Sequence, residues 1–327
     1  MAGIRIAGTG SYVPERILSN QELEQSLDTT DEWIVKRTGV SQRRVARSDQ
    51  AASDLALPAA QQAMQAAGIT AQDLDFIIFG TISPDYACPS AACFLEAKLG
   101  ATKAISFDTT AACSGYIFAM EVGRRFVLTG GQNVLVVASE VMTRMQDWTD
   151  RANCILWGDG AGAMVLQPGD MKPQLLQIYL ATDGASGQNL LVPSGGSLTT
   201  PISYESVDLK KHTLRMIDAA NTLKVAVQFF YEAVEAVVRA QSIAFTDIDY
   251  FVPHQANVRF MQALAKRMGV SMERFIITID KYGNMSAASC AVALDEGIRS
   301  GRIQPGHLVC MPVFGGGLTW GAALIQF

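Results

Sequence analysis

Two observations predict that this chain is an α/β protein built from two similar halves. Short apolar runs rich in β-branched residues alternate with longer segments whose apolar residues recur at helical spacing, as in a βαβ sheet with helices on its faces. The same order of elements repeats after about residue 172, without a detectable repeat of the sequence itself. We therefore expect an N-terminal half at residues 1–172 and a C-terminal half at residues 173–327.

The first half is predicted to begin and end with a strand. Its helix at residues 52–69 follows from apolar side chains near helical spacing and from Gly68, which favours the end of a helix. The other expected elements are a largely buried helix at 113–128 and strands at 4–14, 75–83, 104–110, 130–140 and 158–168.

The second half has a long amphipathic helix at residues 222–242 as its clearest element. Residues 182–210 are rich in Gly, Ser, Thr and Pro, and we expect a long loop or covering segment there, since loops of this length are usually functional or mobile. The remaining expected elements are helices at 258–270 and 286–301 and strands at 175–184, 248–254, 274–280, 307–317 and 318–327.

Composition limits the class of protein. The 327 residues are 49% hydrophobic and 17% charged, which is enough to bury a large core. A net charge of −5 argues against a general attraction to nucleic acid, while a local basic patch for an acidic partner stays compatible with it. No apolar run approaches the ~18 residues of a membrane span, and the start of the chain lacks the pattern of a secretory signal. We expect a cytoplasmic protein that does not bind membranes.

Six cysteines are spread along the chain, and one of them stands at a suggestive place. None lies in a C-x-x-C pair or has a histidine at metal-ligand spacing, so no metal site is expected. Cys113 follows a predicted strand and turn and precedes a helix, whose N-terminus favours the nucleophilic thiolate. A small residue that packs a tight strand–helix junction explains the same position equally well.

Three further segments carry residues suited to chemistry. His254, one of three histidines, ends a predicted strand; a neutral imidazole satisfied in a packed loop is the alternative to a donor that faces a pocket. Asn284 precedes a helix, where a turn or N-cap asparagine is the ordinary explanation. Three glycines at 315–317 join two strands and permit close backbone approach to a ligand. Since such ends converge at one rim of an open sheet, Cys113, His254 and Asn284 fit a nucleophilic set.

Seven segments taken together carry a family resemblance. Four contain the candidate residues, namely DTTAACSG, VPHQANVR, YGNMSAAS and FGGGLTWG, and three others are DTTDEWIVKRTGV, TDRANCILWGDGAGA and GRIQPGHLVC. In these segments, and from Gly8 to Phe327, the chain resembles the β-ketoacyl-acyl-carrier-protein synthase III family. The resemblance implies the thiolase-type fold, which is a five-layered αβαβα duplication, usually a homodimer, with acyl-CoA as a substrate and no cofactor.

The resemblance also implies roles for the candidate residues. Cys113 would take the acyl group from acyl-CoA as a thioester. His254 and Asn284 would hold the thioester carbonyl of malonyl-acyl-carrier-protein while decarboxylation creates an enolate. The backbone N–H groups of Cys113 and Gly316 would form an oxyanion hole.

The resemblance assigns the binding of both substrates as well. Trp33 and Arg151 resemble the pair that sandwiches the CoA adenine. Arg37 would meet a CoA phosphate, and Asn257 the pantetheine arm. The residues expected to dock the acidic carrier protein are Arg259, Lys266 and Arg267.

Cys88 departs from the family pattern. Many members carry a phenylalanine at this place, where it reaches across the dimer interface and closes the acyl pocket. A cysteine is much smaller, so we expect a longer pocket that accepts primers longer than acetyl. The alternative is that Phe94 or Met142 fills the space and leaves an acetyl-sized site.

The leading hypothesis is a condensing enzyme that starts fatty-acid synthesis. A specialised relative that acylates or condenses a secondary-metabolite intermediate would keep the same Cys, His and Asn. A silent partner subunit or carrier-protein scaffold would normally lose its nucleophile, which this chain retains. Thiolase itself is disfavoured, because it needs a second catalytic cysteine near the C-terminal glycines and Cys310 precedes that loop.

Overall fold

One long sheet forms the framework of the molecule. The computed structural model of the chain describes residues 3–198, 201–217 and 219–327, except for the side chains of residues 219–224. The strands of this sheet are β1 (Ile4–Tyr12), β4 (Phe76–Gly80), β5 (Ile105–Thr109), β6 (Val134–Val141), β7 (Asp159–Pro168), β8 (Gln174–Thr182), β11 (Tyr250–Phe251), β12 (Leu308–Gly315) and β13 (Thr319–Gln326). They lie side by side in the order β11-β12-β13-β8-β1-β7-β6-β4-β5.

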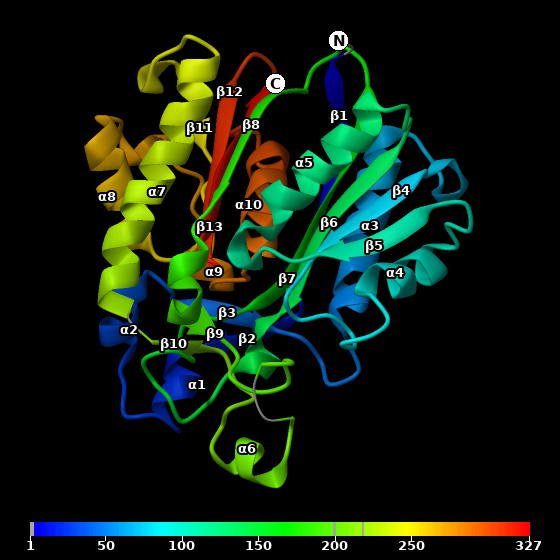
Figure 1. Cartoon of the computed structure of the whole chain (residues 1–327). Helices are drawn as coiled ribbons and strands as arrows, with labels where there is room; N and C mark the ends of the chain where they lie inside the picture. Colours follow the sequence, from blue (N-terminus) through cyan, green and yellow to red (C-terminus); the bar gives the residue numbers. More distant parts are fainter. Residues whose placement is uncertain (1–2, 199–200, 218) are drawn as a thin grey trace.

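Helices cover the outer faces of this sheet, and two further helices lie between its two parts. The helices are α1 (Asn20–Glu24), α2 (Asp31–Thr38), α3 (Ala52–Ala67), α4 (Ala91–Leu99), α5 (Gly115–Leu128), α6 (Tyr204–Asp208), α7 (Ala219–Ala240), α8 (Val258–Met268), α9 (Ile279–Tyr282) and α10 (Ala288–Arg299). Figure 1 shows α3 and α4 on one side, α7 and α8 on the other, and α5 and α10 between the two parts of the sheet. The result is five alternating layers of helix and sheet.

Three apolar cores separate these layers. The central core includes buried residues of α5 and α10, such as Ile117, Met120 and Leu294, together with strand residues from both parts of the sheet. A second core packs α3 and α4 against the strands of the first part. A third packs α7 and α8 against those of the second. Because α5 and α10 are buried from both sides, the segments that precede them are held deep inside the protein.

The order of strands is similar on the two sides of the central contact between β1 and β8. From β1 outward come β7, β6, β4 and β5, and from β8 outward come β13, β12 and β11. On the outer side of β11, Phe251 forms an isolated bridge with Phe275. This order supports a division of the chain near residue 172, which stays a prediction.

The strand predicted at residues 274–280 is wrong beyond its first residues. Phe275 makes its bridge to Phe251, and Ile276 N donates to Phe251 O at 2.9 Å. The side chain of Gln255 then accepts hydrogen bonds from the backbone nitrogens of Thr278 (2.9 Å) and Ile279 (3.2 Å). A side chain that captures backbone donors competes with strand pairing, so the chain turns here into the short helix α9.

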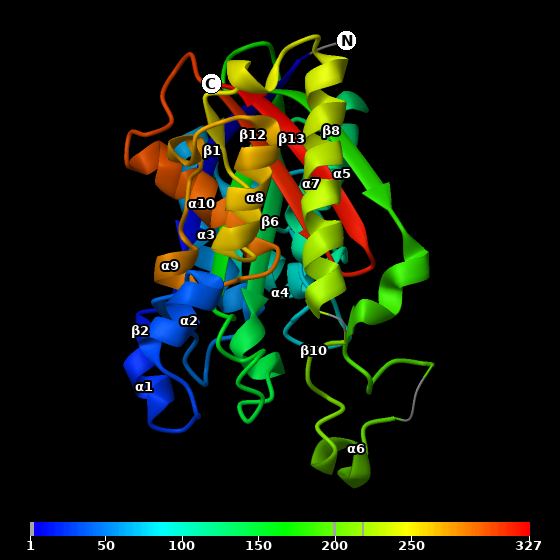
Figure 2. The same ribbon diagram turned by 90° about the vertical axis from the view of Figure 1, so that its left-hand side faces the viewer.

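Residues 182–210 contain more structure than the expected loop. The short strand β9 (Leu190–Leu191) pairs with β10 (Arg215–Met216), and α6 lies between them in the chain. In both views α6 projects from one end of the molecule (Figure 1, Figure 2). A second small ribbon of β2 (Arg16–Ser19) and β3 (Gln42–Val45) lies beside α9.

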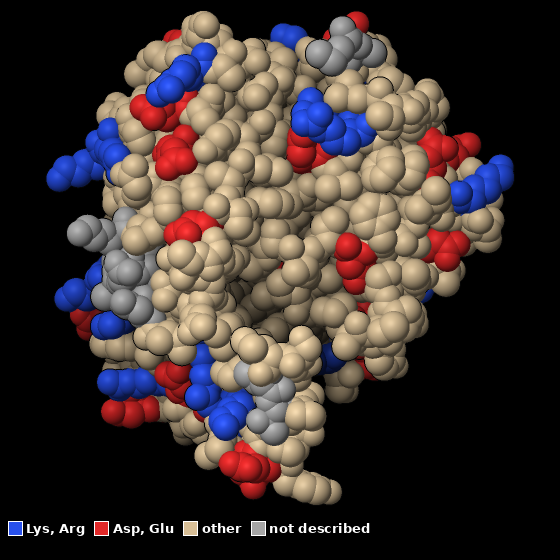
Figure 3. All heavy atoms as spheres, viewed as in Figure 1, with Lys and Arg blue, Asp and Glu red and all other residues tan. Residues whose placement is uncertain are grey.

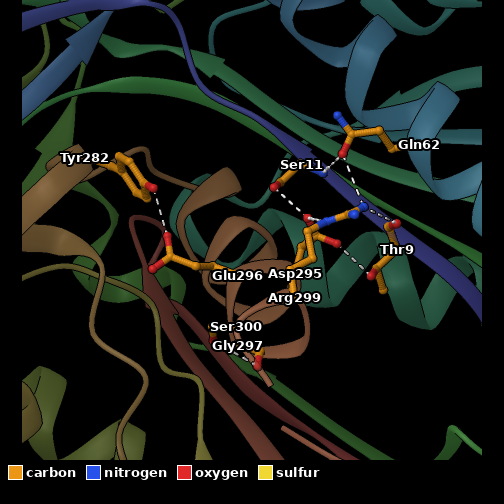
Figure 4. A network of polar contacts seen from close by, with 9 residues as sticks. All are labelled: Thr9, Ser11, Gln62, Tyr282, Asp295, Glu296, Gly297, Arg299 and Ser300. Atoms are coloured by element: carbon orange, nitrogen blue, oxygen red, sulfur yellow. Dashed lines mark hydrogen bonds and ion pairs between the residues drawn. The ribbon is translucent and has the colours of Figure 1, made fainter. Parts of the chain in front are cut away.

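A closed polar junction fastens α10 to the start of the chain (Figure 4). Asp295 is 1% exposed, and its two oxygens accept from Thr9 Oγ1 (2.8 Å), Ser11 Oγ (2.7 Å) and Arg299 Nε (2.7 Å). Arg299 also reaches the side chain of Gln62 on α3 at 3.3 Å. This Asp295 junction therefore ties α10 to β1 and α3.

Across the described residues, no helix combines the length and the apolar character that crossing a membrane requires.

Candidate active site

One cavity brings the three candidate catalytic residues together. It has a volume of about 470 Å³. Besides Cys113, His254 and Asn284, it is lined by Arg37, Thr38, Ala152, Ile155, Leu156, Trp157, Leu190, Met216, Ala256, Asn257, Arg259, Phe260, Phe314, Gly315, Gly316 and Leu318. Figure 3 shows a hollow near the middle of the face that Figure 1 presents. The convergence of element ends expected from the sequence is therefore present.

Cys113 lies in a single 3₁₀ turn, Ala112–Ser114, directly before α5. Ala112 adopts a positive φ of 45°, which is uncommon for a residue with a side chain and marks a constrained turn. Cys113 is 5% exposed, and burial raises the pKa of its thiol to about 12. The resting form is therefore the thiol rather than the thiolate that the sequence analysis expected at a helix N-terminus.

His254 follows β11 and is fixed through its backbone, whose nitrogen donates to Pro312 O at 2.9 Å. The side chain is 2% exposed, and burial lowers the pKa of the imidazole to about 3, so the ring is neutral near pH 7. Its Nδ1 has no hydrogen-bond partner among the described residues. The ring contacts the backbone of Ser286 and lines the cavity, which fits an imidazole that serves a molecule there.

Gln255 holds this histidine in place, a role that the sequence analysis did not anticipate. Besides the two bonds it accepts at the start of α9, its amide donates to Pro253 O (2.8 Å) and Ile276 O (3.1 Å). The side chain is fully buried and uses both ends of its amide. The sequence feature that could have indicated this role is the place of Gln255 in the segment PHQAN, next to the candidate histidine.

Asn284 is anchored by its backbone and by one end of its amide. Its nitrogen donates to Leu156 O at 2.7 Å, and its carbonyl accepts from Gly158 N at 3.0 Å. The side-chain oxygen accepts from Ser286 N at 2.8 Å, a local turn interaction. The Nδ2 group is then the part of this side chain that can donate to a molecule in the cavity.

The glycines at 315–317 lie against the backbone of Cys113. A Cβ atom on Gly315 would lie 2.8 Å from the nitrogen of Cys113 and 2.9 Å from that of Ser114, closer than real side chains approach. Gly317 has a φ of 138°, which favours glycine. Only glycine therefore allows the β12–β13 turn to approach the start of α5 so closely.

A buried carboxyl group, missed by the sequence analysis, lies near the thiol. Glu140 at the end of β6 is fully buried, and burial raises its pKa. Its Oε2 accepts from Thr81 Oγ1 (3.0 Å), from the nitrogens of Ile82 and Ser83 (both 3.1 Å) and from Ser83 Oγ (2.6 Å). Its Oε1 has no partner in the described part of the chain. A residue inside an apolar strand pattern gave no hint of this.

Two arginines lie over the ring of Trp33 beside the cavity. The guanidinium carbons of Arg37 and Arg151 lie 5.0 and 5.1 Å from the centre of its ring. Arg151 is also paired with Asp28 at 3.1 Å. Arg37 lines the cavity, while Trp33 and Arg151 are not among its lining residues.

The residues expected to meet pantetheine and the carrier protein lie at and around α8. Asn257 caps this helix: its oxygen accepts from Arg259 N at 2.9 Å, and its amide donates to Arg37 O at 3.0 Å. Arg259 lines the cavity. Lys266 and Arg267 are exposed on the last turn of α8 and lie outside the lining.

Cys88 is exposed and is not among the residues that line the cavity. It lies between β4 and α4 in the chain. Within one chain the structure therefore does not bring Cys88 to Cys113.

Comparison with known proteins shows the family to which the chain is similar. The family model described as 3-oxoacyl-[acyl-carrier-protein] synthase III matches residues 107–184, and the model of its C-terminal part matches residues 238–327. A β-ketoacyl-[acyl-carrier-protein] synthase III of Desulfitobacterium hafniense is 43% identical over 100% of this chain and 98% of its own length. One from Xanthomonas oryzae pv. oryzae is also 43% identical, over 99% and 98%.

Solved structures show the same fold. The 3-oxoacyl-[acyl-carrier-protein] synthase III of Aquifex aeolicus is 36% identical with a TM-score of 0.90, over 99% of this chain and 100% of that one. The priming β-ketosynthase of the R1128 polyketide biosynthetic pathway is 32% identical with a TM-score of 0.90, over 99% and 96%.

Proposed function

The chain belongs to the 3-oxoacyl-[acyl-carrier-protein] synthase III family of condensing acyltransferases, and from this premise we propose how its residues act on acyl-CoA and malonyl-acyl-carrier-protein. The proposed reaction joins an acyl group to the two carbons left by decarboxylation of the malonyl group and so begins fatty-acid synthesis. The observation that carries the proposal is the single cavity that contains Cys113, His254 and Asn284.

In the first half-reaction, Cys113 attacks the thioester carbonyl of acyl-CoA, and CoA leaves as its thiolate. The tetrahedral intermediate places negative charge on the former carbonyl oxygen. The backbone N–H groups of Cys113 and Gly316 are proposed to stabilise it. The close packing of Gly315 on the Cys113 backbone supports this placement, because it brings the two loops together.

In the second half-reaction, malonyl-acyl-carrier-protein loses CO₂ and becomes an enolate. Two neutral donors, the imidazole of His254 and the Nδ2 of Asn284, are proposed to hold the enolate oxygen. The pKa of about 3 supports this role, since a ring that stays neutral donates a hydrogen bond without giving up its proton. The enolate carbon then attacks the acyl thioester and displaces Cys113.

CoA is proposed to enter along the arginine-flanked tryptophan. Arg151 now covers one face of Trp33, so an adenine that binds between them must displace Arg151 and take its place on the ring. Arg37 is proposed to bind a phosphate. The Asn257 amide already donates to the backbone, so its proposed contact with pantetheine requires that this bond be exchanged.

The carrier protein is proposed to dock on α8. Lys266 and Arg267 are exposed on the last turn of α8, and Arg259 on its first turn lines the cavity, on a protein whose net charge is −5. Lys and Arg side chains are frequent along the left margin of the face in Figure 3, where Figure 1 places α2, α7 and α8. Reversing these three charges should raise the KM for malonyl-acyl-carrier-protein and leave acyl-CoA loading little changed; an unchanged KM would count against the patch.

A homodimer through β5 is proposed. This strand is the edge of the sheet, and Ile105 on it is 61% exposed. An edge with an exposed apolar residue invites pairing with a second copy. In such a dimer the exposed Cys88 would approach the acyl pocket of the partner, which keeps the longer-primer hypothesis open. The cytoplasmic location also stays a proposal.

Mass spectrometry of the protein after incubation with acyl-CoAs of two to twelve carbons tests the function. We expect one acyl group on Cys113, released as 3-ketoacyl product when malonyl-acyl-carrier-protein is added. Loading without product on this acceptor would favour a specialised relative, a candidate raised by the similarity to the R1128 priming enzyme. Repeating the series with Cys88→Phe tests pocket length: an unchanged preference for acetyl would refute the longer pocket.

A further inference from the structure

The proposed chemistry leaves one proton without an acceptor. Cys113 rests as a thiol, because burial raises its pKa to about 12, yet it attacks as a thiolate. His254, with a pKa of about 3, does not hold an extra proton near pH 7. Some other group must take the thiol proton during loading and return one after condensation.

Glu140 is a buried carboxyl group with one oxygen left open. Its Oε2 accepts four hydrogen bonds from residues 81–83, which fix the orientation of the carboxyl group. Oε1 is buried and has no partner among the described residues. By the usual rule that buried polar atoms are satisfied, this atom calls for a functional explanation.

Ser286 connects the open carboxyl oxygen with the thiol. Its hydroxyl interacts with the Cys113 thiol and with the Glu140 carboxyl group, and in each case lowers the pKa. Nevertheless, Oγ is buried and makes no complete hydrogen bond within the described residues. Ser286 also has a positive φ of 47°, a conformation that costs free energy and is found where function requires it.

We propose that Ser286 and Glu140 form a proton relay for Cys113. In this relay the hydroxyl of Ser286 passes the proton to and from the sulfur, and Glu140 acts through it as the proton store. The inference rests on the proposed role of Cys113 as the acylated nucleophile.

The relay balances the two half-reactions. During loading, the thiol proton passes to Ser286 Oγ while the hydroxyl proton passes to Glu140 Oε1. The Cys113 thiolate then bonds to the acyl carbon. CoA departs as a thiolate, which takes a proton from water. During condensation, the enolate carbon bonds to the acyl carbon, and the bond from that carbon to Cys113 breaks. Glu140 then returns its proton through Ser286 to the Cys113 thiolate, so each residue ends as it began.

Few titratable groups surround the relay. Residues 81–83 after β4 present two hydroxyls to Glu140, and the turn before α5 presents Cys113. From α10, Cys290 faces Cys113, and the loop after β11 places His254 against the Ser286 backbone. The relay pair is therefore the main proton-exchanging unit near the sulfur.

The pH dependence of Cys113 alkylation by iodoacetamide distinguishes a relay from a lone thiol. A thiol and a carboxylate that share one proton keep a constant fraction of thiolate between the two macroscopic pKa values of the pair, so the alkylation rate is flat over the neutral range. In Glu140→Gln and Ser286→Gly, the thiolate forms only by losing a proton to water, and the rate rises about tenfold per pH unit. Gly suits the positive φ of residue 286.

Three further measurements complete the test. Glu140→Asp should restore part of the plateau, and Asp295→Asn, which alters a buried carboxylate elsewhere, should retain it. In single-turnover loading, Glu140→Gln should lower the rate at saturating acyl-CoA and leave the half-saturating concentration unchanged. Peptide mapping locates the alkylated residue, so a different reactive cysteine would refute the nucleophile and not only the relay.

Two results would overturn the relay. One is a wild-type rate that already rises tenfold per pH unit. The other is a plateau that survives in Glu140→Gln and Ser286→Gly but disappears in His254→Ala, which would make His254 the base.

Discussion

Two buried carboxyl groups of this protein are treated in opposite ways. Asp295 shares its two oxygens among two hydroxyls and an arginine, and both oxygens are paired. Glu140 gathers four donors on one oxygen and leaves the other without a partner in the described residues. The first arrangement stabilises charge and joins segments; the second keeps a group open for exchange.

The same contrast extends to their surroundings. Around Asp295, α10, β1 and α3 are locked by a closed network. Around Glu140, the Ser286 Oγ and the His254 Nδ1 are also buried without partners among the described residues. Unsatisfied buried atoms reduce stability, so three of them near Cys113 indicate that this region is organised for reaction and the Asp295 junction for folding. Substitutions in the two regions should therefore separate activity from stability.

The largest effect is expected from Cys113→Ala. This change removes the nucleophile, so acyl-enzyme formation should be abolished, while the free energy of unfolding changes by only about 1 kcal/mol because a single buried sulfur is lost. Intact-protein mass spectrometry and urea denaturation measure the two quantities. Cys290→Ala is the matched control, since Cys290 is also a buried free cysteine, and it should load normally. Undiminished loading of Cys113→Ala would sink the assignment.

The next largest effect concerns the two proposed donors to the enolate. His254→Ala and Asn284→Ala should each reduce CO₂ release from malonyl-acyl-carrier-protein by a factor on the order of 10²–10³, the usual loss for one such donor. Acyl loading should persist, since neither side chain is proposed to act in it. His307→Ala, which lies before β12, serves as the control. Normal CO₂ release by both variants would contradict the roles proposed here.

The sequence predicted the reacting residues better than their supports. Cys113, His254 and Asn284 stand out because each ends an element and lies in a recognisable segment. Glu140 ends an apolar strand, and Ser286 lies in a helix start rich in small residues, so neither pattern indicates that they meet across 146 positions of the chain. The helix α9 was missed for a related reason: the sequence of residues 274–280 favours a strand, and only the folded position of Gln255 ends it.

An intermediate effect is expected from Asp295→Asn at the closed junction. The amide keeps one acceptor but presents a donor to groups that had faced a carboxylate, and it loses the charge opposite Arg299. We expect the free energy of unfolding to fall by about 2 kcal/mol, in the range for a charged hydrogen bond. The kcat of the folded enzyme should stay near that of the wild type. A large fall in kcat without loss of stability would mean that the junction also serves the reaction.

The smallest effect is the pH dependence of stability contributed by Glu140. Burial raises the pKa of this carboxyl group above its value in the unfolded chain. As the pH rises through the unfolded pKa, the unfolded chain releases the proton while the folded protein keeps it. The free energy of unfolding therefore falls by up to about 1.4 kcal/mol per pH unit until the pH reaches the folded pKa. Glu140→Gln has no such proton, and its amide can place an oxygen toward residues 81–83 and its NH₂ toward Ser286. Urea denaturation at several pH values should therefore show that Glu140→Gln becomes more stable relative to the wild type as the pH rises from about 4. Asp54→Asn is the control: the pKa of Asp54 is lowered in the folded protein, so this variant should become less stable relative to the wild type over the same range. If Glu140→Gln does not gain stability relative to the wild type over this range, burial does not raise the pKa of the Glu140 carboxyl group in the folded protein.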